Sequence, residues 1–244
     1  MGEKQFHEKV WRALYALLHR GFEWAFRFEH ENYTLERPAL IISNHVTNYD
    51  PILLALSFPK DQMYFVASEH LFRRGLTTKL IRWLFAPIAR RKGSNGMDTA
   101  MATMRKLRDG SSVCIFGEGE TTWNGISQSI VPSTGNLAKL CRADLITYRL
   151  EGGYLTAPRW GQTIRRGRMR GHIVNRYTPE QLKTMKPDEV TAMINRDLYE
   201  DAWARQKEET VRYKGKKLAE KIEIALFMCR SARVWERCTA RETV

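Results

Sequence analysis

One stretch decides the predicted fold of this chain, and it reads Leu40-Ile41-Ile42-Ser43-Asn44-His45-Val46-Thr47-Asn48-Tyr49-Asp50-Pro51. An apolar run rich in isoleucine gives way to a polar pair, Ser43-Asn44, and a second apolar segment begins after Asp50-Pro51. This order predicts a buried strand, then a turn, then the first residues of a helix.

His45 and Asp50 are candidate catalytic residues within this stretch. They are five positions apart, which on one continuous helix would place them about 140° from each other. They meet only across a turn, and the pattern predicts one between them. A carboxylate that holds one ring nitrogen lets the imidazole take a proton from a hydroxyl at neutral pH. The alternative is that Asp50, just before Pro51, is an ordinary helix N-cap.

Composition and charge narrow the class of protein. The chain has 244 residues and is 43% hydrophobic, which is enough to bury a sizeable core as one domain. Its net charge of +13 favours anionic partners: phospholipid headgroups, nucleic acid or an acidic carrier protein. Because no helix-turn-helix, zinc or RNA-binding motif is visible, we expect no nucleic-acid partner.

The cysteines and the apolar runs bear on the compartment. Cys114, Cys141, Cys229 and Cys238 form no C-x-x-C pair, which suits a reducing cytoplasm and predicts neither a disulfide nor a metal site. No signal peptide or long uncharged apolar run is present, so membrane contact is expected to be peripheral. We expect a cytoplasmic protein on the inner face of the membrane.

Three segments are predicted along the chain. Residues 1–30 are an amphipathic N-terminal helix, rich in aromatic and basic side chains over 4–28, that lies in a bilayer interface or packs on the domain. Residues 31–178 are a catalytic core, and 179–244 are a helical C-terminal extension with a long charged helix over 189–208.

Strand and helix patterns alternate through the core. Strands are predicted over 35–43, 63–67, 113–116 and 145–150, and helices over 52–58, 76–85, 98–108 and 134–141. The alternation predicts an α/β fold: a layered, largely parallel sheet flanked by helices, with the N-terminal amphipathic helix added.

A glycine-rich loop follows the predicted strand 113–116. Gly117 and Gly119 flank Glu118, so a ligand can approach this carboxylate closely, although a plain solvated turn is the alternative. Ligands of open α/β sheets bind outside the carboxyl ends of strands. Both His45 and Glu118 follow such an end.

An arginine-rich segment lies farther along the chain. Its arginines fall within a dozen positions and have no acid between them: Arg159, Arg165, Arg166, Arg168 and Arg170. The segment is either the solvated face of a hairpin or a surface that faces an anion.

With these motifs in place, the chain resembles the glycerophospholipid acyltransferase family, in which 1-acyl-glycerol-3-phosphate acyltransferase is the familiar member. The family's H-x-x-x-x-D box is matched from His45 to Asp50, and its E-G box some seventy residues later is matched by Glu118-Gly119. Between them, Pro87-Ile88-Ala89-Arg90 fits the family's arginine after a Pro-Ile strand. The resemblance covers about residues 35–155.

The resemblance implies a reaction. His45 would deprotonate the acceptor hydroxyl, Asp50 would orient the imidazole, and the oxygen would attack the thioester of acyl-CoA or an acyl carrier protein. The implied acceptor is a lysophospholipid or a related glycerol at an anionic membrane surface. No cofactor is implied.

The resemblance also implies substrate-binding residues. Arg90, with Arg91 beside it, would bind the acceptor phosphate through planar bidentate hydrogen bonds. Glu118 and Gly119 would help to fix the acceptor.

The chain departs from the family pattern after the E-G box. Where the family continues E-G-T-R-S, this chain has an extra acid at Glu120, and Thr121 replaces the arginine. The acceptor is therefore expected to differ from lysophosphatidic acid, with Arg149 a candidate for the missing cation. A catalytically weak lipid-binding protein with this fold is the alternative function, and the intact His45 and Asp50 count against it.

The tail from Cys229 shows neither periodicity nor a capping residue. With suitable codons, one base inserted after the Cys229 codon gives a tail that begins Cys-Pro-Glu-Cys, like the knuckle of a zinc ribbon. Our hypothesis is that this tail is frameshifted and packs poorly.

Overall fold

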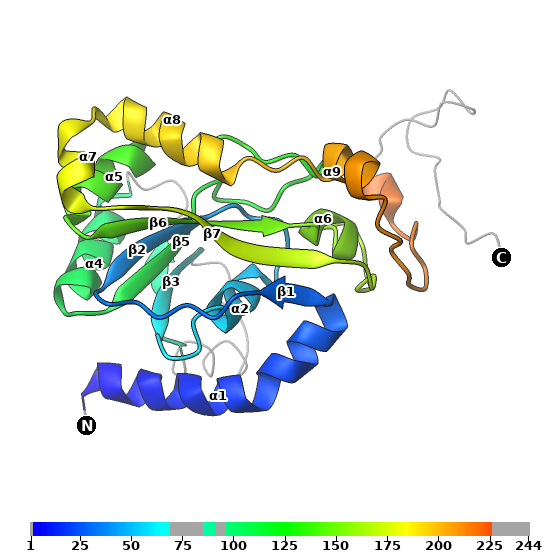
Figure 1. Ribbon diagram of the computed structural model, residues 1–244, viewed down its shortest axis with the longest axis horizontal. Helices are drawn as coiled ribbons and strands as arrows, with labels where there is room; N and C mark the ends of the chain where they lie inside the picture. The colour runs from blue at the N-terminus through cyan, green and yellow to red at the C-terminus, as the bar shows by residue number, and fades with distance from the viewer. Residues whose placement is uncertain (1, 69–84, 91–95, 226–244) are drawn as a thin grey trace.

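The computed structural model describes residues 2–68, 85–90 and 96–225 (Figure 1). The strands are β1 (Phe28–His30), β2 (Ala39–Ser43), β3 (Met63–Ser68), β4 (Ile88–Arg90), β5 (Ser112–Phe116), β6 (Asp144–Glu151) and β7 (Met169–Tyr177). The helices are α1 (Glu3–Phe26), α2 (Asp50–Leu56), α4 (Met97–Arg108), α5 (Ser133–Cys141), α6 (Gly153–Thr156), α7 (Pro179–Thr184), α8 (Pro187–Leu198) and α9 (Ala202–Glu209), with a 3₁₀ turn at Ile222–Ile224. Most of the predicted helix 76–85, Arg91 and the tail from Cys229 lie outside the described residues.

The strands form a single sheet in the order β1-β7-β6-β2-β5-β3-β4. All neighbouring strands are parallel except β6 and β7, which are antiparallel. In the centre, Ser43 of β2 is level with Phe116 of β5 and with Tyr148 of β6, so β2 and β5 end at the same level, whereas β6 continues to Glu151. The largely parallel α/β sheet predicted from the sequence is confirmed.

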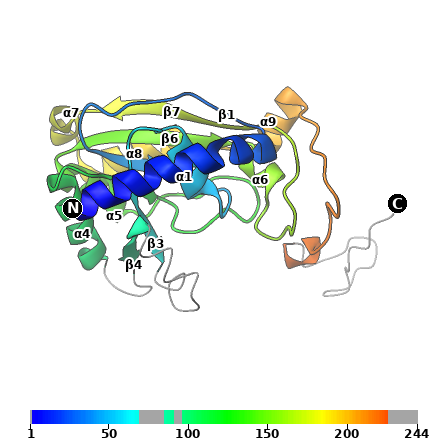
Figure 2. The ribbon, with the colours of Figure 1, turned by 90° about the horizontal axis from the view of Figure 1, so that it is seen from below.

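Helices cover both faces of the sheet (Figures 1 and 2). On one face, α1 and α2 pack on a core that contains Ile41, Cys114 and Tyr148. On the other face, α4, α5 and α8 pack on a core that contains Leu40 and Val113. The β2 run Ala39–Ser43 is buried throughout because both of its faces are covered, which explains why it lacks strand alternation.

Helix α1 packs on the domain through one side and leaves its other side exposed. The Trp11 indole is buried and donates to the Phe58 carbonyl oxygen at 3.1 Å, and Phe26 is buried at the end of the helix. Leu17 and Trp24 point outward, with 76% and 66% of their surface exposed. No helix among the described residues has the length and apolar character needed to cross a bilayer.

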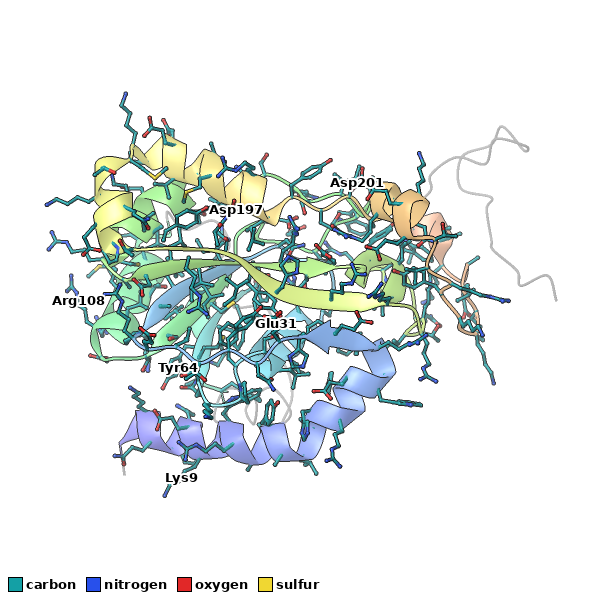
Figure 3. The ribbon with its side chains drawn as sticks, in the orientation of Figure 1. Lys9, Glu31, Tyr64, Arg108, Asp197 and Asp201 are labelled. Carbon is teal, nitrogen blue, oxygen red and sulfur yellow. The ribbon has the colours of Figure 1, made fainter. Side chains whose placement is uncertain are left out.

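The prediction of one long helix over 189–208 is wrong. Helix α8 ends at Leu198 and α9 begins at Ala202, with an extended backbone at Tyr199. The Asp201 carboxylate caps α9 by accepting hydrogen bonds from the amides of Trp203 and Ala204, and Figure 3 shows Asp201 at this helix start. An aspartate with free backbone amides ahead of it is a strong N-cap, so it begins a new helix where the charge pattern continues.

Strands β1 and β7 were not predicted. The β7 segment from Met169 to Tyr177 carries two arginines, Arg170 and Arg176, and it pairs antiparallel with β6 and parallel with β1. The acidic partners of Arg170 come from distant parts of the chain, so the sequence showed only positive charge at the start of this strand.

Candidate active site

The candidate site lies where two central strands send their chains to opposite faces of the sheet. The chain leaves β2 toward α2, which packs on the α1 face, and it leaves the neighbouring β5 toward α5, which packs on the α8 face. In open α/β sheets, ligands usually bind where neighbouring strands diverge in this way, outside the carboxyl ends of the strands. His45 and Glu118 each lie two residues past the end of their strand.

His45 and Asp50 meet across the turn as the sequence predicted. The His45 Nδ1 atom is 2.8 Å from Asp50 Oδ2, and the Asp50 side chain is fully buried. A carboxylate that accepts this hydrogen bond favours the imidazole tautomer with hydrogen on Nδ1, in which Nε2 keeps its lone pair. This is the state that a general base requires.

Asp50 is not the N-cap of α2. Tyr49 is the N-cap residue and its side chain makes no capping bond, while the Asp50 carboxylate points back into the turn. There it accepts hydrogen bonds from the Val46 amide at 2.6 Å and from the Thr47 amide and hydroxyl at 3.0 and 2.7 Å. One carboxylate therefore folds the turn and orients the imidazole together.

The imidazole of His45 rests on an aromatic ring. Its centroid lies 4.4 Å from that of Phe116, with 23° between the planes, and 19% of the side chain is exposed. Within the described part of the chain, Nε2 has no hydrogen-bond partner. The ring is thus held by a stack and one hydrogen bond, with its basic nitrogen unoccupied.

Glu118 ties the loop after β5 to the loop after β2. Its two carboxylate oxygens accept hydrogen bonds from the amides of His45 and Gln128, each at 2.9 Å. The Thr122 amide donates to the His45 carbonyl oxygen, also at 2.9 Å. Burial raises the pKa of Glu118 above its usual range, although both amide hydrogen bonds act to lower it. The carboxylate that we expected to contact the acceptor therefore positions the backbone of His45.

Asn44 is a site residue that the sequence reasoning missed. Its side-chain amide donates to the Leu150 carbonyl oxygen and accepts from the Leu150 amide, both at 2.8 Å. This pair of bonds continues the β2–β6 ladder by one step beyond Ser43 and fixes the backbone that carries His45. The signal available in the sequence was a polar amide immediately after an apolar strand, and the structure shows that this side chain is fully buried and hydrogen-bonded.

The structure brings Arg90 together with Gly119. A Cβ atom at Gly119 would lie 3.2 Å from Arg90 Nη1, and Gly119 has a φ of +77°, which favours glycine. Arg90 is exposed at the end of β4, and no hydrogen bond or ion pair of its side chain occurs within the described residues. The guanidinium is therefore available to an anion at the Gly119 loop.

Arg149 does not replace the cation that Thr121 removes. Its guanidinium donates to Glu151 Oε1 at 3.0 Å and to the carbonyl oxygen of Asp197 on α8. Figure 3 shows Asp197 between α8 and the sheet. Arg149 thus lies on the α8 face, whereas the His45 turn belongs to the α2 face.

Three arginines of the 159–170 segment pair with acids, and Arg168 and Arg170 do so most closely, whereas Arg159 lies 3.4 Å from Glu120. Arg168 bonds Glu29 at 2.9 Å, and both terminal nitrogens of Arg170 bond the two oxygens of Glu209, at 2.8 and 2.9 Å. The interpretation of the whole segment as an anion-facing surface is wrong for these two residues, because their partners come from other elements.

Three arginines of this segment, Arg159 among them, stack on tryptophans. The guanidinium carbon lies 4.2 Å from the ring centroid in the Arg159–Trp123 pair, 4.8 Å in the Arg165–Trp160 pair and 4.3 Å in the Arg166–Trp24 pair. Cation–π contacts occur about once per 70–80 residues in proteins, so three contacts from one loop are far more frequent than this average. The loop lies beside the candidate site, since Trp123 belongs to the loop after β5.

The fold and the site together define a class of enzyme: an α/β protein with a His–Asp pair that can activate a hydroxyl, and an arginine near it that can bind an anion. A family model described as Acyltransferase matches residues 25–161, more than half of the chain. The chain belongs to the acyltransferase family. The membership predicted from the sequence motifs is confirmed, and the protein is an acyltransferase.

A solved structure supports the fold. The chain is similar to the crystal structure of the 1-acyl-sn-glycerophosphate (LPA) acyltransferase PlsC from Thermotoga maritima, with a TM-score of 0.66 and 17% sequence identity. The match covers 88% of this chain and 85% of that chain. No curated protein has a sequence that matches this chain.

Proposed function

We propose that this acyltransferase moves a fatty acyl group from a thioester, acyl-CoA or an acyl carrier protein, to the hydroxyl of a lysophospholipid or a related glycerol acceptor. The observation that carries the proposal is the His45–Asp50 pair, whose Nδ1–Oδ2 hydrogen bond of 2.8 Å leaves Nε2 as a free base. Arg90 beside Gly119 supplies a guanidinium for the acceptor phosphate. The role follows from chemistry, because a planar guanidinium matches phosphate in a bidentate manner.

The proposed step balances without any further reactant. As the acceptor oxygen bonds to the thioester carbonyl carbon, Nε2 of His45 accepts the hydroxyl proton. The carbon–sulfur bond then breaks, and the departing thiolate takes the proton back from Nε2. The products are an ester and a free thiol, and His45 returns to its starting state.

Direct transfer is favoured over an acyl-enzyme intermediate. Near His45, the described hydroxyl and thiol groups of Ser43, Thr47 and Cys114 are all buried, and the Thr47 hydroxyl donates to Asp50. Burial raises the pKa of the Cys114 thiol well above its usual value, and the charge of Asp50 adds to this. A buried thiol with a raised pKa is a poor nucleophile.

We infer that the enzyme works as a peripheral protein on an anionic membrane, at its inner face. Support comes from the outward Leu17 and Trp24 of α1 and from Arg166 stacked on Trp24. Apolar and aromatic side chains beside cations suit the boundary between headgroups and acyl chains. A lysophospholipid acceptor would be found there.

The proposal is tested by incubating the protein with labelled acyl-CoA or acylated carrier protein and a panel of lysophospholipids and glycerol phosphates. We expect ester formation that falls about 10²- to 10⁴-fold in His45→Ala, the usual contribution of a general base. His19→Ala is the matched control, because this partly buried histidine lies on α1 outside the site. Thermal unfolding should show that both variants fold. No transfer by the wild-type protein, or full activity in His45→Ala, contradicts the proposal.

A further inference from the structure

We propose that Arg159 is a second ligand for the phosphate of the acceptor, and that Glu120 holds Arg159 in place until the phosphate arrives. The inference rests on the proposed function and adds a specificity-determining residue to it. It starts from a pairing at the tip of the loop after β5: Arg159 Nη1 lies 3.4 Å from Glu120 Oε2.

Arg159 lies on a fixed platform. Its guanidinium covers the ring of Trp123 at 4.2 Å. The Trp123 backbone is held because Tyr154 donates its hydroxyl hydrogen to the Trp123 carbonyl oxygen at 3.0 Å, and the buried Trp160 indole donates to the Tyr154 oxygen at 3.2 Å. Stacking uses the face of a guanidinium and leaves its in-plane N–H groups free for an anion.

Two guanidiniums therefore reach adjacent residues of one loop. Arg90 comes from β4 and lies against Gly119, whereas Arg159 follows α6 and pairs with the next residue, Glu120. The same loop carries Glu118, which holds the His45 amide. A phosphate bound between the two arginines would thus lie beside the loop that positions the base.

The structure offers a physical reason why Thr121 stands where the family pattern has an arginine. Only 6% of Thr121 is exposed, so its side chain is packed into the loop and an arginine would not fit there without displacing its neighbours. Arg159 brings a cation to this loop from another segment. We conclude that the positive charge has moved within the site.

Arg159 can exchange its ion pair with Glu120 for an ion pair with a phosphate. Half of the Glu120 side chain and a third of the Arg159 side chain are exposed, at 50% and 33%, and exposed ion pairs contribute little to stability. A phosphate carries more charge and more acceptor oxygens than a carboxylate, so it competes well for the guanidinium. Glu120 therefore opposes phosphate binding, because it occupies Arg159 and repels the anion.

Steady-state kinetics with a short-chain, water-soluble lysophospholipid acceptor test the proposal. In Arg159→Ala we expect the acceptor KM to rise about 10- to 100-fold, with little change in kcat or in the donor KM, and Arg159→Lys should lie between. In Glu120→Gln we expect the acceptor KM to fall several-fold. A monoacylglycerol, which has no phosphate, should respond to none of these changes.

Arg176→Ala is the matched control. Arg176 is also exposed and lies over an aromatic ring, Tyr33 at 5.9 Å, but it is on β7, level with Ile146 near the amino end of β6. The Arg176→Ala substitution should leave the acceptor KM unchanged. If Glu120→Gln and Arg159→Ala both raise the acceptor KM, the pair is only a structural salt bridge and the proposal is overturned.

Two further measurements separate this proposal from others. Calorimetric binding of the soluble acceptor, without donor, should weaken in Arg159→Ala even if the wild-type protein transfers no acyl group, so failure of the proposed function is recognised separately. Flotation with anionic vesicles should be equal in Arg159→Ala and wild type. Lost flotation with unchanged acceptor binding would show that Arg159 serves the membrane surface, which overturns the proposal.

Discussion

At the scale of single residues, Asp50 shows how one buried side chain both stabilises a turn and orients His45. Its carboxylate accepts hydrogen bonds from Val46, Thr47 and His45, so both of its oxygens are bonded to residues of one turn. A fully buried carboxylate is stable only when it is hydrogen-bonded in this way. The orientation of His45 is thus a consequence of how the turn folds.

We predict that Asp50→Asn reduces acyl transfer by several orders of magnitude while the protein remains folded. The carboxamide N–H₂ group of asparagine would donate a hydrogen bond to Nδ1 of His45, where the carboxylate only accepted one. The imidazole would then carry its hydrogen on Nε2, and Nε2 could no longer accept a proton from the acceptor hydroxyl. The measurement is kcat with a saturating acceptor, beside thermal unfolding.

Asp61→Asn is the control for this prediction. Asp61 also accepts a backbone hydrogen bond, from the Leu35 amide at 3.0 Å, but it lies in a turn away from His45. The Asp61→Asn variant should keep the acyl-transfer activity of the wild-type protein. Near-normal turnover in Asp50→Asn would mean that Asp50 only organises the turn.

At the scale of elements, α1 has two different sides. The side with Trp11 and Phe26 is part of the core, and the other side exposes Leu17 and Trp24. Deleting the helix would expose the core and would not test membrane binding alone. Point substitutions on the outer side do test it.

We predict that Leu17→Glu and Trp24→Ala each weaken flotation with anionic vesicles and that added salt weakens it further. An apolar side chain and a tryptophan would leave the interface, and each nearby basic residue contributes about 1 kcal/mol to binding an anionic surface. Leu140→Glu is the control, because Leu140 is half-exposed on α5, on the opposite face of the sheet. Equal binding of the wild-type protein to neutral and anionic vesicles would refute the electrostatic part.

At the scale of the whole molecule, a charged cluster ties α9 to the sheet. Arg205 of α9 donates to both oxygens of Glu200, at 2.8 and 2.6 Å, and lies 3.0 Å from Glu151 of β6. Arg170 of β7 bonds Glu209 at the end of α9. Glu151 and Glu200 are buried, so this cluster holds charges that need their partners.

We predict that Arg205→Ala lowers the free energy of unfolding by about 3 kcal/mol at neutral pH, because it removes the cation paired with buried Glu200 and one of the cations paired with buried Glu151. Urea unfolding measures the change. Burial acts to raise the pKa of Glu209, but hydrogen bonds and charges from Arg170 and Arg205 hold it below the usual 4.5. A lowered carboxyl pKa stabilises the fold above pH 4.5 and loses this effect as the pH falls below it.

The difference between Arg205→Ala and wild type should therefore shrink in acid. Arg212→Ala, a nearby arginine with no ion pair among the described residues, should unfold like the wild type. A constant difference at all pH values would mean that Arg205 acts through packing alone.

The sequence by itself determined the features that depend on neighbouring residues. The apolar run ending at Ser43 is a buried strand because its side chains must leave water, and His45 and Asp50 meet because a turn separates them. The loop at Glu118 follows its strand for the same local reason. These features were enough to predict that His45 and Asp50 meet and to identify the acyltransferase family.

Only the tertiary structure decided which distant groups meet. Glu118 holds the His45 amide across 73 positions, Asn44 pairs with Leu150 across 106, and Arg168 finds Glu29 across 139. Strand order sets such pairings, and β7 joined the sheet although its own sequence carried no clear strand pattern. The physical reason is that a polar group is satisfied by whatever partner the packed sheet brings within about 3 Å, and separation along the chain does not record that distance.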